Sequence, residues 1–125
     1  MKAKRTWIYC RTAYPDAHAL AVQQRTLEAF SKQHSFEVVG ITAEHASGLD
    51  CIHTRLSEAS KAVAAGEVDI LLVTDLERLG RVLMETDSYL RWLEDHFVDL
   101  VCADGTIPQT STEILHNLIK HHGMS

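Results

Sequence analysis

Four short apolar segments, each followed by a stretch with helical periodicity, constrain the fold of this chain more than any other feature of its 125 residues. Each segment has four to six residues, is rich in apolar residues such as Val and Ile, and is bounded by charged or turn residues, as β-strands are. None alternates cleanly between apolar and polar residues, which predicts strands buried on both faces. The four segments are 7–10, 36–41, 69–73 and 99–102.

Apolar residues at helical spacing fill the stretches that follow these segments. Pro15 and Asp16 suit the start of the first helix, and Gly66 suits the end of the second. The last helix is predicted to run from about 112 to 122 and to stop at Gly123. The apolar stripes are Leu20, Leu27 and Phe30; Leu56, Ala59 and Val63; Leu83, Leu90, Leu93 and Phe97; and Ile114, Leu115, Leu118 and Ile119.

Strands that alternate with helices predict an α/β fold built on a mostly parallel sheet. We expect one domain over 1–125, a three-layer fold with a four- to five-stranded sheet, in which 1–110 form the α/β core and 111–122 a short C-terminal helix. The composition, 46% hydrophobic and 23% charged, is that of an ordinary globular domain. No apolar run approaches the about 18 residues that cross a bilayer, so we expect no membrane association and a cytoplasmic location.

The cysteines and histidines of the chain predict no metal and no cofactor. Cys10, Cys51 and Cys102 are far apart and odd in number, so neither a disulfide framework nor a metal site of paired cysteines fits them. Most of the eight histidines are scattered, and the three near the C-terminus lack the spacing of a helical zinc site. We therefore expect reduced thiols and surface histidines.

Arginines follow two of the predicted strands, although the net charge of −5 argues against general nucleic-acid binding by the whole surface. Arg11 follows the first strand, and Arg78 and Arg81 follow the third, on one face of a helical turn. Ligands of such sheets bind beyond the carboxyl ends of the strands, and the planar guanidinium group matches phosphate oxygens. The alternative is ion pairing with Asp75 and Glu77, and the spacing taken alone favours it.

Two further polar residues stand at positions that call for an explanation. Gln23 lies within the apolar stripe of the first helix, where a polar side chain needs a hydrogen-bond partner. It either braces a backbone loop, the interpretation that we favour from the residue alone, or orients a residue of the site. Ser47 follows the second strand and either forms a local turn or contacts a phosphate.

Five motifs next to the predicted strands match those of one protein family in order and spacing. The segment 9–13 (Tyr-Cys-Arg-Thr-Ala) resembles a Tyr-x-Arg-Val-Ser opening, and 75–81 (Asp-Leu-Glu-Arg-Leu-Gly-Arg) resembles a Leu-Asp-Arg-Leu-Gly-Arg signature. Gln23 falls where the family keeps a glutamine, 46–48 resembles its Ala-Ser-Gly turn, and 104–105 its Asp-Gly turn. The chain thus resembles the catalytic domain of serine recombinases, the resolvase/invertase family.

This resemblance implies DNA cleavage and rejoining without a metal. A serine hydroxyl attacks a backbone phosphate and becomes linked to the 5′ end, while positive donors stabilise the transition state. The resemblance assigns catalysis and phosphate binding to Arg11, Arg78 and Arg81, with Ser47 as a further phosphate contact. It assigns supporting roles to Tyr9, Gln23, His53, Arg55, Asp75 and Glu77.

The chain departs from the family pattern in three places. Ala13 occupies the position of the nucleophilic serine, or Tyr14 does if one inserted residue is placed earlier. Alanine has no oxygen with which to attack. His53 stands where the family has an arginine, with Arg55 close by. The predicted helix over 112–122 spans roughly 16 Å, far less than the family's long dimer-forming helix, and no DNA-binding module follows it.

Three hypotheses for the function follow. The first is a degenerate recombinase domain that keeps its phosphate site, does not cleave DNA, binds it weakly alone, and modulates recombination by associating with itself or with an intact recombinase. The second is an active module in which Tyr14 or another hydroxyl attacks. The third is a non-enzymatic α/β interaction or regulatory module whose arginines form ion pairs.

Overall fold

A four-stranded parallel sheet forms the centre of the computed structural model, which describes residues 2–45, 57–79 and 83–107, with the backbone alone at 57 and 83–86. The strand order is β2-β1-β3-β4, and every neighbouring pair is parallel. The α/β fold and the parallel sheet are therefore confirmed. The strands are β1 (Arg5–Thr12), β2 (Glu37–His45), β3 (Ile70–Val73) and β4 (Asp99–Cys102).

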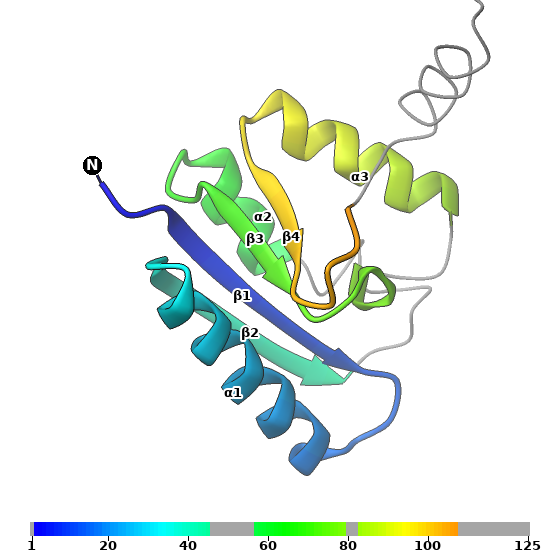
Figure 1. Cartoon of the computed structure of the whole chain (residues 1–125). Coiled ribbons are helices and arrows are strands. Elements are labelled where there is room, and N and C mark those ends of the chain that lie inside the picture. The colour runs from blue at the N-terminus through cyan, green and yellow to red at the C-terminus, as the bar shows by residue number, and fades with distance from the viewer. Residues whose placement is uncertain (1, 46–56, 80–82, 108–125) are drawn as a thin grey trace, which may run out of the picture.

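Helices cover the sheet on both faces, which gives three layers (Figure 1). One apolar core lies between the sheet and α1, and a second core lies between the sheet and the pair α2 and α3. Successive residues of β1 alternate between these cores, with Ile8 on the α1 side and Tyr9 on the other. The helices are α1 (Ala17–Gln33), α2 (Ser57–Ala64) and α3 (Leu83–Asp95), and a 3-10 turn, η2 (Leu76–Leu79), follows β3.

The prediction that all strands are buried on both faces is correct for β1 and β3 but wrong for the two edge strands β2 and β4, since only Cys102 of β4 is buried. The central strands are almost fully buried, because each has a strand on either side and helices above and below. By contrast, β2 lies at one edge, and its Val38, Val39 and Ile41 are 39–40% exposed. An apolar segment in the sequence therefore marks the strand but not its place in the sheet.

A tryptophan fixes the register of β2 against β1. The pairing skips Val39, so that Thr6 faces Val38 and Trp7 faces Gly40. A side chain at Gly40 would collide with the ring of Trp7, so only glycine fits there. The indole Nε1–H donates to Thr42 Oγ1 (3.0 Å), which joins the two strands through their side chains as well as their backbones.

The start of the first helix and the end of the second lie where the sequence predicts them. Asp16 caps α1, since its Oδ1 accepts from the N–H of Ala19 (2.9 Å). Gly66 follows α2 with a positive φ of 72°, and its N–H donates to the carbonyl of Val63 (3.0 Å). The chemistry of helix caps is local, which explains why single residues reveal it.

The helices α1 and α3 share one kind of C-terminal end. An aromatic residue is followed four positions later by a histidine, whose ring lies against it and whose Nδ1 meets its carbonyl oxygen at 2.8–2.9 Å. The pairs are Phe30 with His34 (ring centroids 4.0 Å apart) and Trp92 with His96 (4.3 Å). The next residues, Ser35 and Phe97, adopt the left-handed conformation with φ of 58° and 60°.

Phe97 corrects one further prediction. The spacing placed it in the apolar stripe of the third helix, but α3 ends at Asp95 and Phe97 is 90% exposed. The left-handed turn redirects the chain, and Val98 enters the core in its place, 3% exposed. Among the described helices, none has the length and hydropathy needed to cross a membrane.

Candidate phosphate-binding site

The carboxyl ends of β1 and β3 bring the predicted site residues together. These strands are parallel neighbours, paired from Thr6 with Ile70 to Ile8 with Leu72, so both end at the same edge of the sheet. Arg11 stands near the end of β1, and the turn η2, which carries Arg78, follows β3. Parallel topology thus places two arginines that are far apart in sequence beside one another.

Arg11 and Arg78 hold each other's backbone. Arg11 donates from Nε to the carbonyl oxygen of Arg78 (3.0 Å) and from Nη2 to that of Glu77 (2.6 Å). Arg78 donates in return from Nη1 to the carbonyl oxygen of Arg11 (2.8 Å). We call this reciprocal arrangement the arginine clasp. Arg11 is 4% exposed, so the clasp is a buried link between β1 and η2.

Within the clasp, Arg11 donates to two backbone carbonyl oxygens. Backbone carbonyls are dipoles, which satisfy N–H donors without supplying a full negative charge. Arg78 differs, because its Nε also lies 3.3 Å from Asp75 Oδ2 and donates to Thr74 Oγ1 (3.3 Å). The predicted Asp75–Arg78 ion pair is therefore present, and it is about one-quarter to one-third exposed on either side (27% and 30%).

Gln23 braces the backbone of Arg11. Its Oε1 accepts from the N–H of Arg11 (3.1 Å), and its Nε2 donates to the carbonyl oxygen of Arg11 (3.0 Å). The side chain thus acts on β1 as a neighbouring strand would, which accounts for a polar residue inside an apolar stripe. Because Gln23 and Arg78 donate to the same carbonyl, the position of Arg11 is held from both layers of helices.

The turn between β1 and α1 carries Ala13 and Tyr14, the two residues that the sequence comparison offered for the nucleophile position. Thr12 is buried and donates from Oγ1 to the carbonyl oxygen of Tyr14 (2.6 Å), which fixes the shape of the turn. Ala13 lies between them and is exposed. Tyr14 is 78% exposed. Ala13 is therefore a surface residue of this turn, and its side chain is a methyl group.

Glu44 is a residue of this region that the sequence reasoning missed. It pairs with Arg11 in the β1–β2 register, at the same end of the sheet. Its Oε1 accepts from the hydroxyl of Tyr9 (3.4 Å), whose ring is fully buried. The signal in the sequence was an acid at the end of the second strand, just before the Ala-Ser-Gly turn. Tyr9 is thus tied to β2, which supports the strand that bears Arg11.

Several predicted site residues lie outside the described part of the chain. Glu77 is described and exposed, but it contributes its carbonyl oxygen to the clasp, and its predicted partner Arg81 is not described. The other predicted residues outside the described ranges are Ser47, His53 and Arg55.

Buried thiols flank the site without the properties of nucleophiles. Burial raises the pKa of Cys10 to about 11, against the opposing effect of Arg78. Burial, with the charges of Asp104 and Asp75, raises the pKa of Cys102 to about 11. Both are free, as expected, and both are protonated at neutral pH. Within the described ranges no three His, Cys, Asp or Glu side chains gather as a metal site would require.

The fold is thus a parallel α/β sheet with a clasped pair of arginines at its carboxyl edge, the edge where ligands of such sheets bind. The family model "Resolvase, N terminal domain" matches residues 6–121. The chain therefore belongs to the family of resolvase N-terminal domains and is a recombinase-type domain. A comparison with curated protein sequences finds no match.

Three similar solved structures come from two recombinases and an integrase. The C-terminal catalytic domain of ISC1926 TnpA, an IS607-like serine recombinase, is 23% identical with a TM-score of 0.71 (94% of this chain, 79% of that one). The N-terminal catalytic domain of TP901-1 integrase is 17% identical with a TM-score of 0.74 (97% and 95%). A resolvase family site-specific recombinase from Streptococcus pneumoniae is 19% identical with a TM-score of 0.72 (97% and 86%). These likenesses establish the resolvase catalytic-domain fold.

Proposed function

We propose that this domain binds a phosphate of the DNA backbone beside Arg11 and Arg78 and does not cleave it. One observation carries the proposal: the exposed residue at the turn after β1, next to the arginine clasp, is Ala13. A competent site needs an oxygen nucleophile there, which forms the new bond to phosphorus as the bond to the 3′ oxygen breaks. A methyl group can form no such bond.

The remaining chemistry of the site supports binding. Phosphoryl transfer depends on positive donors placed around the phosphate oxygens before the reaction begins. Arg11 and Arg78 are held in place by buried contacts from β1, α1 and η2, so little ordering is left for a ligand to impose. We propose that such a domain modulates recombination by associating with itself or with an intact recombinase, which would supply both the nucleophile and most of the DNA affinity.

A second candidate function is favoured by one contact. The Asp75–Arg78 ion pair is what a non-enzymatic α/β interaction module would show if its arginines served the scaffold alone. Titration with inorganic phosphate, followed by the amide NMR signals of β1 and η2, separates the two candidates. Saturable shifts at Arg11 and Arg78 that disappear in Arg78→Ala support phosphate binding. Shifts that are absent, or equal in wild type and Arg78→Ala, support the interaction module.

A nicking assay on supercoiled DNA tests the missing nucleophile. We expect the wild-type domain to leave the DNA intact even when a partner recombinase with an inactivated serine supplies DNA binding. Ala13→Ser should produce nicks or a covalent protein–DNA adduct under the same conditions, and Ala13→Gly, the matched control, should not. Cleavage by the wild-type domain, with an adduct mapped to Tyr14 or another hydroxyl, would contradict the proposal.

A further inference from the structure

The carboxylate of Asp75 has one oxygen that contacts Arg78 and one oxygen without a partner. Its Oδ2 accepts from Thr74 Oγ1 (3.1 Å) and from Arg78 Nε (3.3 Å). Its Oδ1 is buried without a hydrogen bond, a condition that it shares only with Ser31 Oγ among the described side chains. A buried carboxylate oxygen that lacks a donor has lost its hydration without compensation. The place of Asp75 beside Arg78 is therefore only partly satisfied.

The ion pair of Asp69 and Arg5 shows what a satisfied pair looks like in this molecule. The two oxygens of Asp69 accept from Arg5 Nε (3.1 Å) and Nη2 (3.0 Å). Such a two-point pair fixes a guanidinium group in place. Asp75 instead reaches Arg78 through one oxygen, and the Nε–H that it meets is also directed at Thr74 Oγ1 (3.3 Å). Another acceptor can therefore replace this single, long contact.

The position of Arg78 does not depend on Asp75. Its Nη1 donates to the carbonyl oxygen of Arg11 (2.8 Å), and its own carbonyl oxygen accepts from Arg11 Nε (3.0 Å). Both contacts are shorter than the one to Asp75, and they anchor Arg78 to a buried residue of β1. The negative charge of Asp75 thus lies against a guanidinium group that is already held. An anionic ligand of Arg78 would have to compete with that charge.

We propose that Asp75 is a built-in competitor, which an anionic ligand displaces from Arg78, and that it thereby sets the affinity of the site for phosphate. This inference rests on the proposed function. On displacement, Arg78 exchanges a carboxylate oxygen for a phosphate oxygen, and both oxygens of Asp75 regain water. The side chains of the pair are 27% and 30% exposed, so the carboxylate has solvent to turn into.

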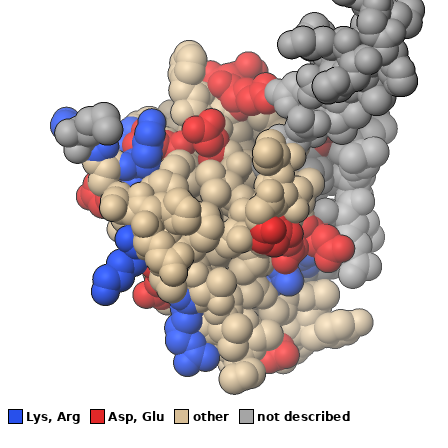
Figure 2. Space-filling view, in the orientation of Figure 1, with Lys and Arg blue, Asp and Glu red and all other residues tan. Residues whose placement is uncertain are grey.

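The neighbouring turn offers a matched carboxylate. The N–H of Asp104, which follows β4, donates to the carbonyl oxygen of Thr74 (3.0 Å), so the turns after β3 and β4 lie side by side. Figure 2 shows acidic groups with few basic atoms beside them where Figure 1 draws η2 and this turn. Asp104 Oδ1 accepts from the backbone N–H of Thr106 (2.9 Å). Asp104 therefore carries the same charge as Asp75 in a different contact.

Titration with inorganic phosphate, followed by the amide NMR signals of β1 and η2, tests the competition. We expect Asp75→Asn to bind phosphate about three- to tenfold more tightly than wild type, because the amide keeps the shape and removes the competing charge. The control Asp104→Asn removes the same charge next to the site and keeps an oxygen for Thr106. Its affinity should change by less than about twofold, since exposed charges are screened.

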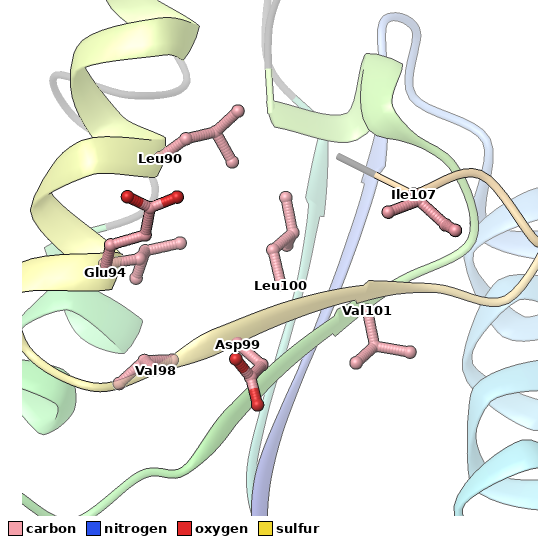
Figure 3. A pocket seen from close by; sticks show the side chains of 8 residues that line it. Leu90, Glu94, Val98, Asp99, Leu100, Val101 and Ile107 are labelled. Atoms are coloured by element: carbon pink, nitrogen blue, oxygen red, sulfur yellow. The ribbon is translucent and has the colours of Figure 1, made fainter. Parts of the chain in front are cut away.

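A pocket between α3 and β4 provides an internal reference for the titration. Leu90, Leu100 and Ile107 turn toward a common space there, and the charged residues of its lining are Glu94 and Asp99 (Figure 3). Neither Lys nor Arg is among the described residues that line it, so phosphate should leave their amide signals unmoved. Shifts as large there as at the clasp would be a general salt effect and would overturn binding at Arg78.

The side-chain carboxyl carbon of Asp75 reports the displacement in the unaltered chain. At saturation with phosphate, its NMR signal should move toward that of Asp95, an exposed carboxylate at the end of α3. This measurement needs no variant, so it decides the question even if Asp75→Asn does not fold. A carboxyl signal that stays in place at saturation overturns the displacement.

The outcomes separate this inference from the proposed function. Tighter binding by Asp75→Asn, with the control unchanged, supports the competition. Equal or weaker binding by Asp75→Asn overturns the competition alone, since Asp75 would then be a bystander or would position Arg78. Equal tightening in Asp104→Asn also overturns it, because total charge would then explain the gain. Absence of saturable shifts in all three proteins overturns the proposed phosphate binding together with the competition.

Discussion

The strand β1 carries one arginine near each end, and the two arginines have different kinds of partner. Arg5, at the amino end of β1, donates from Nε and Nη2 to the two carboxylate oxygens of Asp69 (3.1 and 3.0 Å) and from its backbone N–H to the same group (2.9 Å). Arg11, at the carboxyl end, donates to the carbonyls of Glu77 and Arg78. The side chain of Arg5 pairs with a carboxylate, whereas the side chain of Arg11 holds two backbone carbonyl oxygens of η2.

The two arginines also differ in how far they are buried. Arg5 is 42% exposed and its ion pair lies on the surface, where water and salt weaken it. Arg11 is buried, and its clasp joins the carboxyl end of β1 to η2. The contacts of Arg11 at the carboxyl end of β1 are thus more buried than those of Arg5 at the amino end. Substitutions at the carboxyl end should therefore lower the free energy of unfolding more.

Arg11→Ala should produce the largest effect. It leaves two carbonyls without their buried donor, and we expect a loss of about 3 kcal/mol in the free energy of unfolding, measured in urea. Arg11→Lys keeps the positive charge but lacks the planar guanidinium group, so we expect a smaller loss in the free energy of unfolding. This variant provides the measurement if Arg11→Ala does not fold. Arg5→Ala at the other end should cost distinctly less. Equal losses at the two ends would remove the contrast between them.

Gln23→Leu should have the next largest effect. The variant fits the apolar stripe but removes both hydrogen bonds to the backbone of Arg11, so we expect a loss of about 2 kcal/mol. Gln24→Leu is the matched control, because Gln24 bonds only to the exposed Glu28 on the helix surface (2.9 Å), and it should change stability by less than about 0.5 kcal/mol. If the two variants behave alike, the bracing of Arg11 contributes nothing.

Acidic pH should selectively weaken the contact between Arg5 and Asp69 at the amino end of β1. The hydrogen bonds from Arg5 lower the pKa of Asp69 from 3.8 to about 2, so this carboxylate stabilises the fold fully above pH 4. That contribution is lost as the pH falls through 4 toward 2, because the unfolded chain takes up the proton first. In Asp69→Asn the fall in unfolding free energy between pH 4 and pH 2 should be shallower than in wild type, as measured by urea titration at each pH. Parallel curves would show that the ion pair has no effect on the pKa.

The loops that lead into β2 and β4 should tolerate glycine substitutions, and these substitutions should stabilise the fold. Ser35 and Phe97 occupy left-handed positions that glycine adopts without strain. We expect Ser35→Gly and Phe97→Gly each to raise the melting temperature, by a stabilisation of about 1 kcal/mol or less. A fall in the melting temperature of Phe97→Gly alone would mean that the exposed ring has a packing role.

Much of the fold could be predicted because it rests on local patterns. The segments 69–73 and 99–102 match β3 and β4 closely, since apolar runs and turn residues mark both. The length of β1 could not be predicted, because Arg5 and Arg11 join the strand through pairing with Glu37 and Glu44 on β2. The exposure of β2 depends on its edge position, and no pattern within one strand reports its neighbours.

The candidate site was predictable in part for a similar reason. Parallel topology brings the ends of β1 and β3 together, so the proximity of Arg11 and Arg78 follows from the order of the strands. Their partners do not, because every residue has a carbonyl and the sequence holds no mark of one that accepts from an arginine. Glu44 was missed because its contact with Tyr9 crosses from one strand to the next.

The turn at Ala13 has one more consequence. The clasp, the brace from Gln23 and the bond from Thr12 to Tyr14 run through the residues on either side of it, and the methyl group of Ala13 bears none of them. The hydrogen bonds that shape this turn therefore do not depend on the side chain at position 13. A substitution there can change the chemistry of the turn while the fold around it is kept.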